Sequence, residues 1–173
     1  MAKIGLFYGS KRGNTADAAM TIKESFDQVE PDLVEVHNVK RIELSKMNEY
    51  EKIILGSSTW EAGQLQMHWK RAFPQMDEID LHGKQVAVFG FGNQSEFNTT
   101  FQGGIAILSQ KARERGADLV GLWPIDGYQV ADCPAVEDGH FVGLALDNTN
   151  QHELTKERIQ TWVQQLISEF GLG

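Results

Sequence analysis

The sequence has very few cysteines and prolines and no long apolar run. Its 173 residues include one Cys, Cys133, and four Pro. A single cysteine excludes an internal disulfide framework, and together with five scattered His it gives no ligand spacing typical of structural zinc. No apolar stretch approaches the roughly 18 residues of a membrane-spanning helix, and the N-terminus lacks a cationic region leading into an apolar one. We therefore expect a cytoplasmic protein without a metal site.

Basic residues are also scarce relative to acidic ones. Lys and Arg together number 16 and Asp and Glu 24, so the formal net charge is -8. This balance argues against a nucleic-acid backbone or an anionic membrane as the partner, and it allows electrostatic steering toward a basic protein surface. No repeat, low-complexity tract or Pro/Gly/Ser linker interrupts the chain, and we expect one domain over residues 1–173.

The sequence does contain a regular alternation of short apolar runs and helical patterns. Nearly unbroken apolar runs are typical of parallel strands covered on both faces, and parallel neighbours need crossover helices. The alternation predicts a doubly wound α/β fold with helices on both faces of the sheet. We expect strands over residues 4–8, 33–36, 52–56, 85–90 and 119–123, and helices from Asn14 and over 64–76, 104–115 and 155–170.

One segment breaks this rhythm. About thirty residues separate Trp123 from the final helix, which is long for a loop without structure of its own. The segment contains several Pro and Gly residues and then a second apolar stretch over 141–146. We therefore expect an insertion that returns to the sheet edge at residues 141–146.

The loop after the first predicted strand could bind phosphate. It runs from Gly9 to Thr15 and combines two glycines, two hydroxyls, an amide and two cations. A helix N-terminus offers unpaired N–H groups and the positive end of the helix dipole, so it can hold an anion. The same residues could equally serve as a plain helix cap, with Asn14 or Thr15 as the capping residue.

Three better-known phosphate sites do not fit. A P-loop needs Lys-Ser/Thr directly after its last glycine, but Asn14-Thr15 follow Gly13. A dinucleotide fingerprint needs a third glycine, but Ser95 stands in its place after Gly90 and Gly92. A signalling receiver domain needs an aspartate at the end of the third strand, where this chain has Gly56-Ser57-Ser58.

Two further loops carry aromatic residues to the same edge of the sheet. Trp60 follows the third strand, and Phe97 and Phe101 follow the fourth. Rings from two loops suit a flat heteroaromatic ligand, because stacked ring pairs contribute about 0.5 to 1.5 kcal/mol beyond their buried area. A loop aromatic can also be local core, but beside an anion loop these rings favour a planar, phosphorylated cofactor.

Taken together, residues 4 to 170 resemble the long-chain flavodoxins. The resemblance is carried by GLFYGS at the start, STWEAGQLQ in the second loop, GFGNQ in the third, GLWPIDGY at the insertion, and FVGLALD leading into LTKERIQTWV. It implies a flavodoxin-like sheet of five parallel strands in the order 2-1-3-4-5, with the insertion in the last strand. It further implies a monomeric carrier of single electrons that binds flavin mononucleotide (FMN) and has no substrate-turnover site of its own.

The resemblance also implies roles for particular residues. The phosphate loop maps onto Ser10, Lys11, Arg12, Gly13, Asn14 and Thr15. The inner stacking ring maps onto Trp60 in the loop of Ser58, Thr59, Trp60, Glu61, Ala62 and Gly63, and the outer ring onto Phe97. The peptide between Glu61 and Ala62 matches one that reorients toward flavin N5 on reduction. Gly92 and Asn93 would meet the pyrimidine edge, with Gln102 close by.

Four positions depart from the family pattern. Arg12 stands in place of a Thr, Phe97 in place of a Tyr, Asn93 in place of an Asp, and Gly103 where an acidic residue is common. The flavin would then lie in a less negative field than usual, which predicts a low-potential couple that is less negative. Asn93→Asp and Arg12→Thr should move that couple downward.

Two other functions stay open at this point. One is an FMN-dependent reductase, which shares the fold but needs room for a substrate over the flavin, where Phe97 stands. The other is a binding module that has lost FMN, with Arg12 and Asn93 as signs of that loss. For the carrier, we expect redox partners with basic docking surfaces, such as a reductase or photosystem-type donor and a low-potential acceptor.

Overall fold

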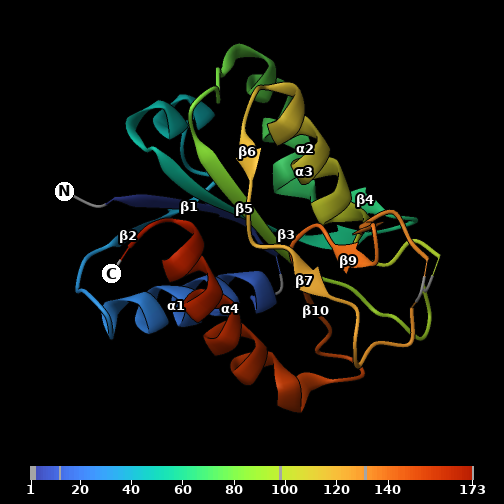
Figure 1. Ribbon diagram of the computed structural model, residues 1–173. Helices are drawn as coiled ribbons and strands as arrows, with labels where there is room; N and C mark the ends of the chain where they lie inside the picture. Colours follow the sequence, from blue (N-terminus) through green and yellow to red (C-terminus); the bar gives the residue numbers. More distant parts are fainter. Residues whose placement is uncertain (1–2, 12, 98, 131, 173) are drawn as a thin grey trace.

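A central parallel sheet organises the molecule. The computed structural model describes residues 3–11, 13–97, 99–130 and 132–172. Its sheet has the order β10-β5-β3-β1-β2, and every neighbouring pair along it is parallel (Figure 1). The strands are β1 (Ile4–Gly9), β2 (Val34–Asn38), β3 (Lys52–Trp60), β5 (Gln85–Phe91) and β10 (Leu144–Leu146). Counting only these long strands, the predicted fold class and the order 2-1-3-4-5 are confirmed.

The last strand of the sheet is split into two pieces. β6 (Asp118–Leu119) pairs with the start of β5, and β10 pairs with its end. Between them, β7 (Trp123–Pro124), β8 (Val136–Glu137) and β9 (His140–Phe141) form a separate sheet in the order β7-β9-β8, with both pairs antiparallel. The expected insertion in the last strand is therefore confirmed, and it pairs its strands with one another.

Helices cover both faces of the parallel sheet. α1 (Asn14–Asp27) and α4 (Thr155–Glu169) lie side by side on one face, while α2 (Met67–Ala72) and α3 (Gly103–Glu114) lie on the other (Figure 1). Three short 3₁₀ helices complete the chain: η1 (Leu44–Glu49), η2 (Phe73–Glu78) and η3 (His152–Leu154). None of the helices in the described part of the chain has the length and apolarity that crossing a bilayer requires.

The helix expected over residues 64–76 differs from the structure. β4 (Gln64–Leu65) turns back on β3 as an antiparallel strand, α2 begins only at Met67, and η2 follows at Phe73. Gln66 fixes the start of α2, since its side-chain oxygen accepts from His68 N at 2.9 Å. Pro74 explains why the α-helix does not continue, because proline lacks the N–H donor and its ring clashes with the preceding turn.

The core lies between the sheet and its two helical layers. The apolar runs of the inner strands are buried, as at Ile53 and Ile54 of β3, whereas the runs 33–36 and 119–123 include the exposed residues Glu35 and Leu122. Trp69 and Trp162 are also completely buried, one under each face, and each satisfies its indole N–H on a backbone carbonyl: Trp69 on Gly56 at 2.6 Å and Trp162 on Gly121 at 2.9 Å. Pairing these donors avoids the desolvation cost of an unsatisfied buried N–H.

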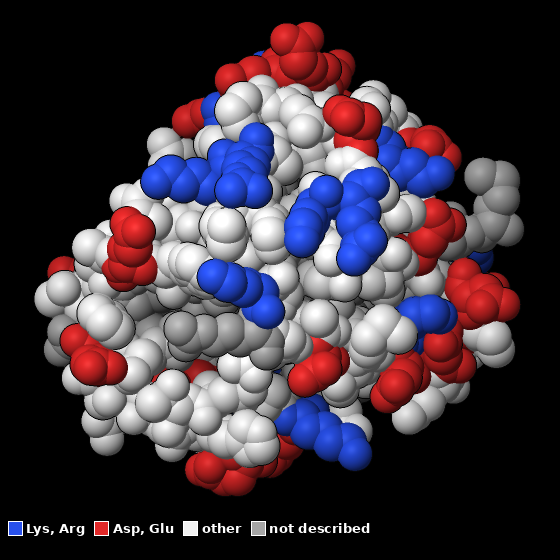
Figure 2. All heavy atoms as spheres, turned by 180° about the vertical axis from the view of Figure 1, so that it is seen from behind, with Lys and Arg blue, Asp and Glu red and all other residues white. Residues whose placement is uncertain are grey.

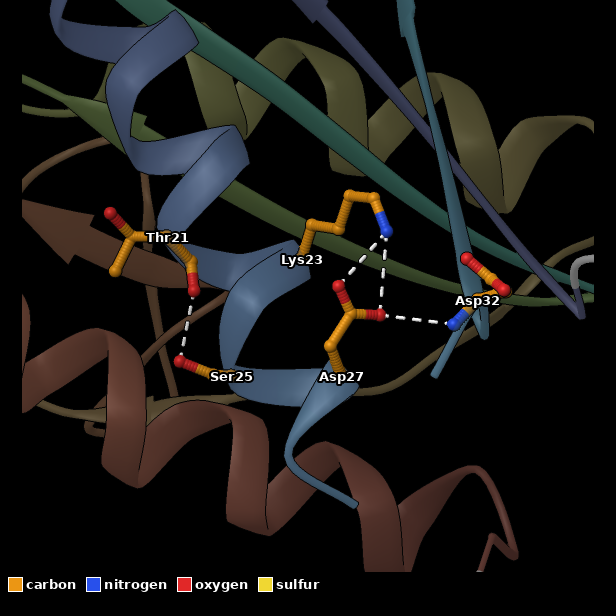
Figure 3. Close-up of polar contacts among 5 residues, drawn as sticks. All are labelled: Thr21, Lys23, Ser25, Asp27 and Asp32. Atoms are coloured by element: carbon orange, nitrogen blue, oxygen red, sulfur yellow. Dashed lines mark hydrogen bonds and ion pairs between the residues drawn. The ribbon is translucent and has the colours of Figure 1, made fainter. Parts of the chain in front are cut away.

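The connection from α1 to β2 is held by one carboxylate. Asp27 lies between the Lys23 amine, 3.0 Å away, and the backbone N–H of Asp32, 3.1 Å away (Figure 3). Asp32 has a φ of 64°, a left-handed conformation that non-glycine residues seldom adopt. The Asp27 contact helps hold this turn, so that β2 starts in register beside β1.

Candidate functional site

A cavity of about 280 Å³ opens where the long parallel strands end. Its walls come from the four segments that follow β1, β3, β5 and β10. The lining residues are Ser10, Lys11, Asn14, Thr15, Ser58, Thr59, Glu61, Phe91, Gly92, Asn93, Phe97, Thr100, Phe101, Gln102, Asn148 and Thr149. A larger cavity of about 930 Å³ runs along the edge strand β2, but none of the predicted site residues lines it. The smaller cavity is the candidate site, because ligands of open α/β sheets bind beyond the carboxyl ends of the strands.

The first wall is the start of α1. Gly13 occupies the position before the helix with a φ of 95°, and no side chain caps the helix among the described residues. The alternative in which Asn14 or Thr15 serves only as a cap is therefore wrong. The hydroxyl of Ser10 accepts from Gly13 N at 3.1 Å and so shapes the loop. The first-turn N–H groups of a 14-residue helix are thus left for another acceptor, which makes this end suited to an anion.

The second wall is a tight hairpin between β3 and β4. Thr59 pairs with Leu65 and Trp60 with Gln64, so the chain reverses over Glu61, Ala62 and Gly63. Glu61 has a φ of 49°, which costs a non-glycine residue about 1 to 2 kcal/mol. The hydroxyl of Thr59 accepts from Gly104 N at 3.1 Å and ties the hairpin to α3.

Close packing of this hairpin explains one departure from the family pattern. A Cβ atom on Gly103 would lie 2.4 Å from the carbonyl oxygen of Gly63. Any larger side chain at position 103 would therefore force the hairpin and the start of α3 apart.

The two predicted aromatic rings differ in environment. Trp60 is half-buried, and its indole N–H donates to Ser58 Oγ at 3.0 Å. The Lys11 amine lies 5.8 Å from the centre of its ring, within the range of a cation–π contact. Phe97 lines the cavity and is 49% exposed, so one of its faces is open to solvent. Phe101, by contrast, is buried in the core against Phe141 and Tyr128.

The third wall is folded around the side chain of Asn93. Its Oδ1 atom accepts from Ser95 N and Glu96 N, both at 3.2 Å, and its Nδ2 donates to Glu96 at 3.0 Å. These bonds form a local turn that the side chain of Asn favours. Gly92 precedes the turn, and a Cβ atom there would lie 2.9 Å from the Phe101 ring. The backbone at Gly92 and Asn93 is therefore fixed before any ligand arrives.

Gln102 joins the third wall to the fourth. It is completely buried in a left-handed conformation, and its Nε2 donates to the Leu146 carbonyl at 3.0 Å. The same carbonyl accepts from Gly92 N at 3.0 Å. The Oε1 atom of Gln102 has no partner among the described residues. A buried acceptor without a donor is uncommon in native structures, and this one faces β5, because a Cβ atom on Gly90 would lie 3.0 Å from it.

The fourth wall rests on a buried carboxylate that the sequence reasoning did not single out. Asp147 is fully buried and accepts from Gln94 N, Gln94 Nε2 and Asn150 Nδ2 at 2.9 to 3.0 Å, and from two further backbone amides. Burial alone would raise the pKa of Asp147, but these hydrogen bonds outweigh it and hold the pKa below its usual value. The carboxylate thus clamps the loop after β5 to the loop after β10.

The structure brings together most of the predicted site. The predicted residues that line the cavity are Ser10, Lys11, Asn14, Thr15, Ser58, Thr59, Glu61, Gly92, Asn93, Phe97 and Gln102. Gly13, Trp60, Ala62 and Gly63 lie in the same loops without lining it, and Arg12 lies outside the described residues. The prediction did not assign the lining residues Phe91, Thr100, Phe101, Asn148 and Thr149 to the site. For Asn148 and Thr149 a signal was present, because polar residues follow the apolar stretch 141–146 at the same edge of the sheet.

Comparison with known proteins relates this chain to one family. Residues 6–162 match the family model for flavodoxin. The chain is 45% identical over 170 residues to a flavodoxin of a Nostoc species, covering 98% of each protein. It is 40% identical over 170 residues to flavodoxin 2 of Escherichia coli, covering 97% of this chain and 96% of that protein.

Solved structures give the same relationship. The crystal structure of Fusobacterium nucleatum flavodoxin bound to FMN superposes with a TM-score of 0.90 at 32% identity, covering 98% of this chain and 99% of that one. Oxidised flavodoxin 2 of Bacillus cereus superposes with a TM-score of 0.77 at 27% identity, covering 98% and 100%.

Proposed function

The chain belongs to the flavodoxin family, and we propose from this premise that it binds FMN in the cavity at the strand ends and carries single electrons between redox partner proteins. The observation that supports this best is the convergence of four loops on one cavity whose α1 end carries no side-chain cap. FMN has a phosphate tail and a planar ring. The cavity likewise has one end at the N-terminus of α1, which suits an anion, and another end lined by the aromatic Phe97.

The α1 end would hold the phosphate. Its donors are the uncapped N–H groups from Asn14 onward, with the hydroxyl of Thr15 and the amine of Lys11 close by in the same loop. The helix dipole and the lysine charge both favour a dianion there. We assign Ser10, Lys11, Gly13, Asn14 and Thr15 to this role. Arg12 is assigned to it by sequence position alone.

The hairpin and the third loop would hold the ring. We assign one stacking face to Phe97, which lines the cavity, and the other to Trp60, which lies in the hairpin beside the cavity without lining it. Ser58, Thr59, Glu61, Ala62 and Gly63 supply the rest of that hairpin segment. The left-handed Glu61 precedes Ala62 directly, so the peptide between them belongs to a turn that is already strained. We propose this peptide as the group that meets flavin N5.

The far edge of the ring would meet Gly92, Asn93 and Gln102. Gln102 lines the cavity, and its bond to the Leu146 carbonyl holds this wall in place. The FMN, when bound, supplies the one-electron chemistry; the protein binds it, orients it, shields it from water and sets the surrounding charge. No side chain of the site needs to act as an acid, a base or a nucleophile.

We further propose that the chain is a monomeric, cytoplasmic, single-domain protein without substrate turnover of its own. Its acidic balance suits docking on basic surfaces of redox partners, such as a reductase or photosystem-type donor and a low-potential acceptor. The competing reductase function needs an open flavin face, and Phe97 stands over that face. Sustained NAD(P)H oxidation by the purified protein alone would favour the reductase instead.

Spectroscopy of the purified protein tests the proposal. We expect a yellow protein that releases FMN on denaturation and rebinds added FMN in a one-to-one ratio, with quenching of the flavin fluorescence by the stacked rings. A colourless folded protein with no affinity for FMN would contradict the proposal and favour a binding module that has lost its cofactor.

Redox titration tests the charge around the ring. Asn93→Asp places a carboxylate beside Glu96, which the Asn93 amide contacts at 3.0 Å, and so makes the field more negative. We expect the low-potential couple to move downward, and likewise for Arg12→Thr. Asn93→Ser is the neutral control, and an unchanged potential in Asn93→Asp would show that position 93 does not tune the flavin.

A further inference from the structure

A basic face lies on the side of the sheet that carries α2. Lys40 and Arg41 follow β2, and Lys70 and Arg71 lie in α2; all four are exposed. Figure 2 shows Lys and Arg gathered over the middle of the face seen from behind, with Asp and Glu toward its margins. The local charge of this face is therefore positive, whereas the chain as a whole has a net charge of -8.

These four cations differ from six of the twelve other Lys and Arg residues of the chain. Lys3, Lys23, Lys46, Lys84, Lys111 and Arg113 each form an ion pair with a carboxylate. Within the described residues, Lys40, Arg41, Lys70 and Arg71 have no carboxylate within ion-pair distance. Their charges are therefore directed to solvent and available to another molecule.

The cations surround a groove of about 360 Å³. Lys40, Arg41 and Arg71 line it together with the apolar residues Val39, Ile42 and Ala72, and Glu43 is the one acidic residue in the lining. His68 forms part of its wall, and its Nδ1 atom is buried without a hydrogen-bond partner among the described residues. The groove thus combines positive charges, apolar side chains and a wall residue, His68, whose buried Nδ1 has no partner among the described residues.

The pKa of His68 is affected by the positive charges around it. Burial lowers the pKa of His68, and Lys40, Arg71 and Lys11 lower it further by repelling a positive charge. The groove also lies close to the phosphate end of the cavity. Val39 of the groove lining donates its N–H to the Tyr8 carbonyl at 2.9 Å, and the loop that starts at Gly9 leads to Lys11 in the cavity lining.

We propose that this groove docks an acidic segment of a partner protein. Arginine pairs with carboxylates in two parallel hydrogen bonds, and the apolar floor accommodates the aliphatic parts of a peptide. A single-stranded nucleic acid fits less well, because no Phe, Tyr or Trp lines the groove for bases to stack on. Because the remaining surface is acidic, such a partner would be turned toward this face alone, beside the phosphate end of the cavity.

Titration of the FMN-loaded protein with a decaglutamate peptide at low ionic strength tests this docking. We expect the backbone amide NMR signals of residues 39–43 and 66–75 to shift, and the affinity to fall as salt is added. Arg41→Glu and Arg71→Glu should each weaken binding about fivefold or more. Lys156→Glu, which makes the same charge change at an exposed site on α4, should weaken it less than about twofold.

Four results would overturn the proposal. They are no binding, equal weakening by Lys156→Glu, displacement of the peptide by inorganic phosphate at matched ionic strength, and tighter binding of a ten-nucleotide single-stranded DNA than of the peptide. Displacement by phosphate would identify a small-anion site, and tighter DNA binding a nucleic-acid site. Arg41→Gln and Arg71→Gln, checked by circular dichroism, replace either Glu variant that does not fold.

Discussion

The two ends of the candidate FMN cavity are built in opposite ways. Among the described residues of the α1 end, one side-chain hydrogen bond, from Gly13 N to Ser10, shapes the loop, and the first-turn amides have no side-chain cap. At the other end, Asp147, Gln94 and Asn150 form a dense network that satisfies a buried charge. The first end keeps its donors for a ligand, and the second uses its polar groups to hold itself together. A variant at the second end should therefore reduce stability, and a variant at the first should mainly reduce ligand affinity.

The largest effect is expected on removing the buried carboxylate. Asp147→Ala removes the acceptor of Gln94 N, Thr149 N and Asn150 N, while Gln94 Nε2 keeps Gln151 Oε1 and Asn150 Nδ2 keeps Asn93 Oδ1. Unsatisfied buried groups are costly, and we expect the free energy of unfolding to fall by about 3 kcal/mol in urea denaturation of the apoprotein. A loss below about 1 kcal/mol, as is common for surface substitutions, would show that the two ends do not differ in this way.

Acid titration sharpens the same contrast. Because the pKa of Asp147 is lowered in the folded state, its ionised form stabilises the fold above the unfolded-state pKa of about 3.9. That contribution disappears as the pH falls through the folded pKa. The difference in unfolding free energy between wild type and Asp147→Asn should therefore shrink on acidification below about pH 4. A difference that is constant over this range would mean that the charge of Asp147 contributes nothing.

A smaller loss is expected from a methyl group at Gly92. Its Cβ would lie 2.9 Å from the Phe101 ring and 3.3 Å from Gln102 N, so the wall must move to admit it. Overpacking of this kind costs about 1 to 3 kcal/mol, and Gly92→Ala should lose that much stability and some FMN affinity. Gly83→Ala is a comparison with the opposite balance: nothing lies within 4 Å of its Cβ, but its φ of 80° is left-handed, whereas Gly92 is not a positive-φ residue. A loss below about 1 kcal/mol in Gly92→Ala would show that the wall admits the methyl group without overpacking.

The smallest change in stability is expected at the α1 end. Ser10→Ala removes one partly buried hydrogen bond, and the apoprotein should lose about 0.5 to 1 kcal/mol at most. FMN affinity, measured by fluorescence titration, should fall by more than that stability change alone predicts, because the loop would no longer be shaped for the phosphate. A loss of stability as large as that of Asp147→Ala would remove the distinction between the two ends.

Much of the fold could be predicted from apolar periodicity. The runs of β1, β3 and β5 are buried on both faces, so they are nearly free of polar residues and easy to recognise, whereas the edge strand β2 is partly exposed. The hairpin at Gln64 and Leu65 could not be predicted, because a two-residue strand has no periodicity and Glu61, which turns the chain, is not a residue that favours positive φ. The break at Pro74 could have been predicted from proline chemistry alone.

The sequence predicted the candidate site only in those loops whose residue types are typical of ligand binding. Glycines and hydroxyls pointed to the loop after β1, and aromatic rings to the loops after β3 and β5. Asn148 and Thr149 follow their strand only as ordinary polar residues, and their place in the cavity depends on the pairing of β10 with β5, which joins residues distant in sequence. Asp147 was missed for the same reason, since its hydrogen-bond partners at Gln94 lie more than fifty residues away.

The split last strand has a consequence for shortening this protein. β6 and β10 meet β5 at separate registers, so the segment between them could be removed without cutting the long parallel strands. Gln129 N, however, donates to Gln94 Oε1 at 2.7 Å, and Gln151 Nε2 donates to the Gly127 carbonyl at 2.8 Å. A trimmed version would therefore keep the parallel sheet but lose both hydrogen bonds. The insertion thus also supports the loops that form the far wall of the candidate FMN cavity.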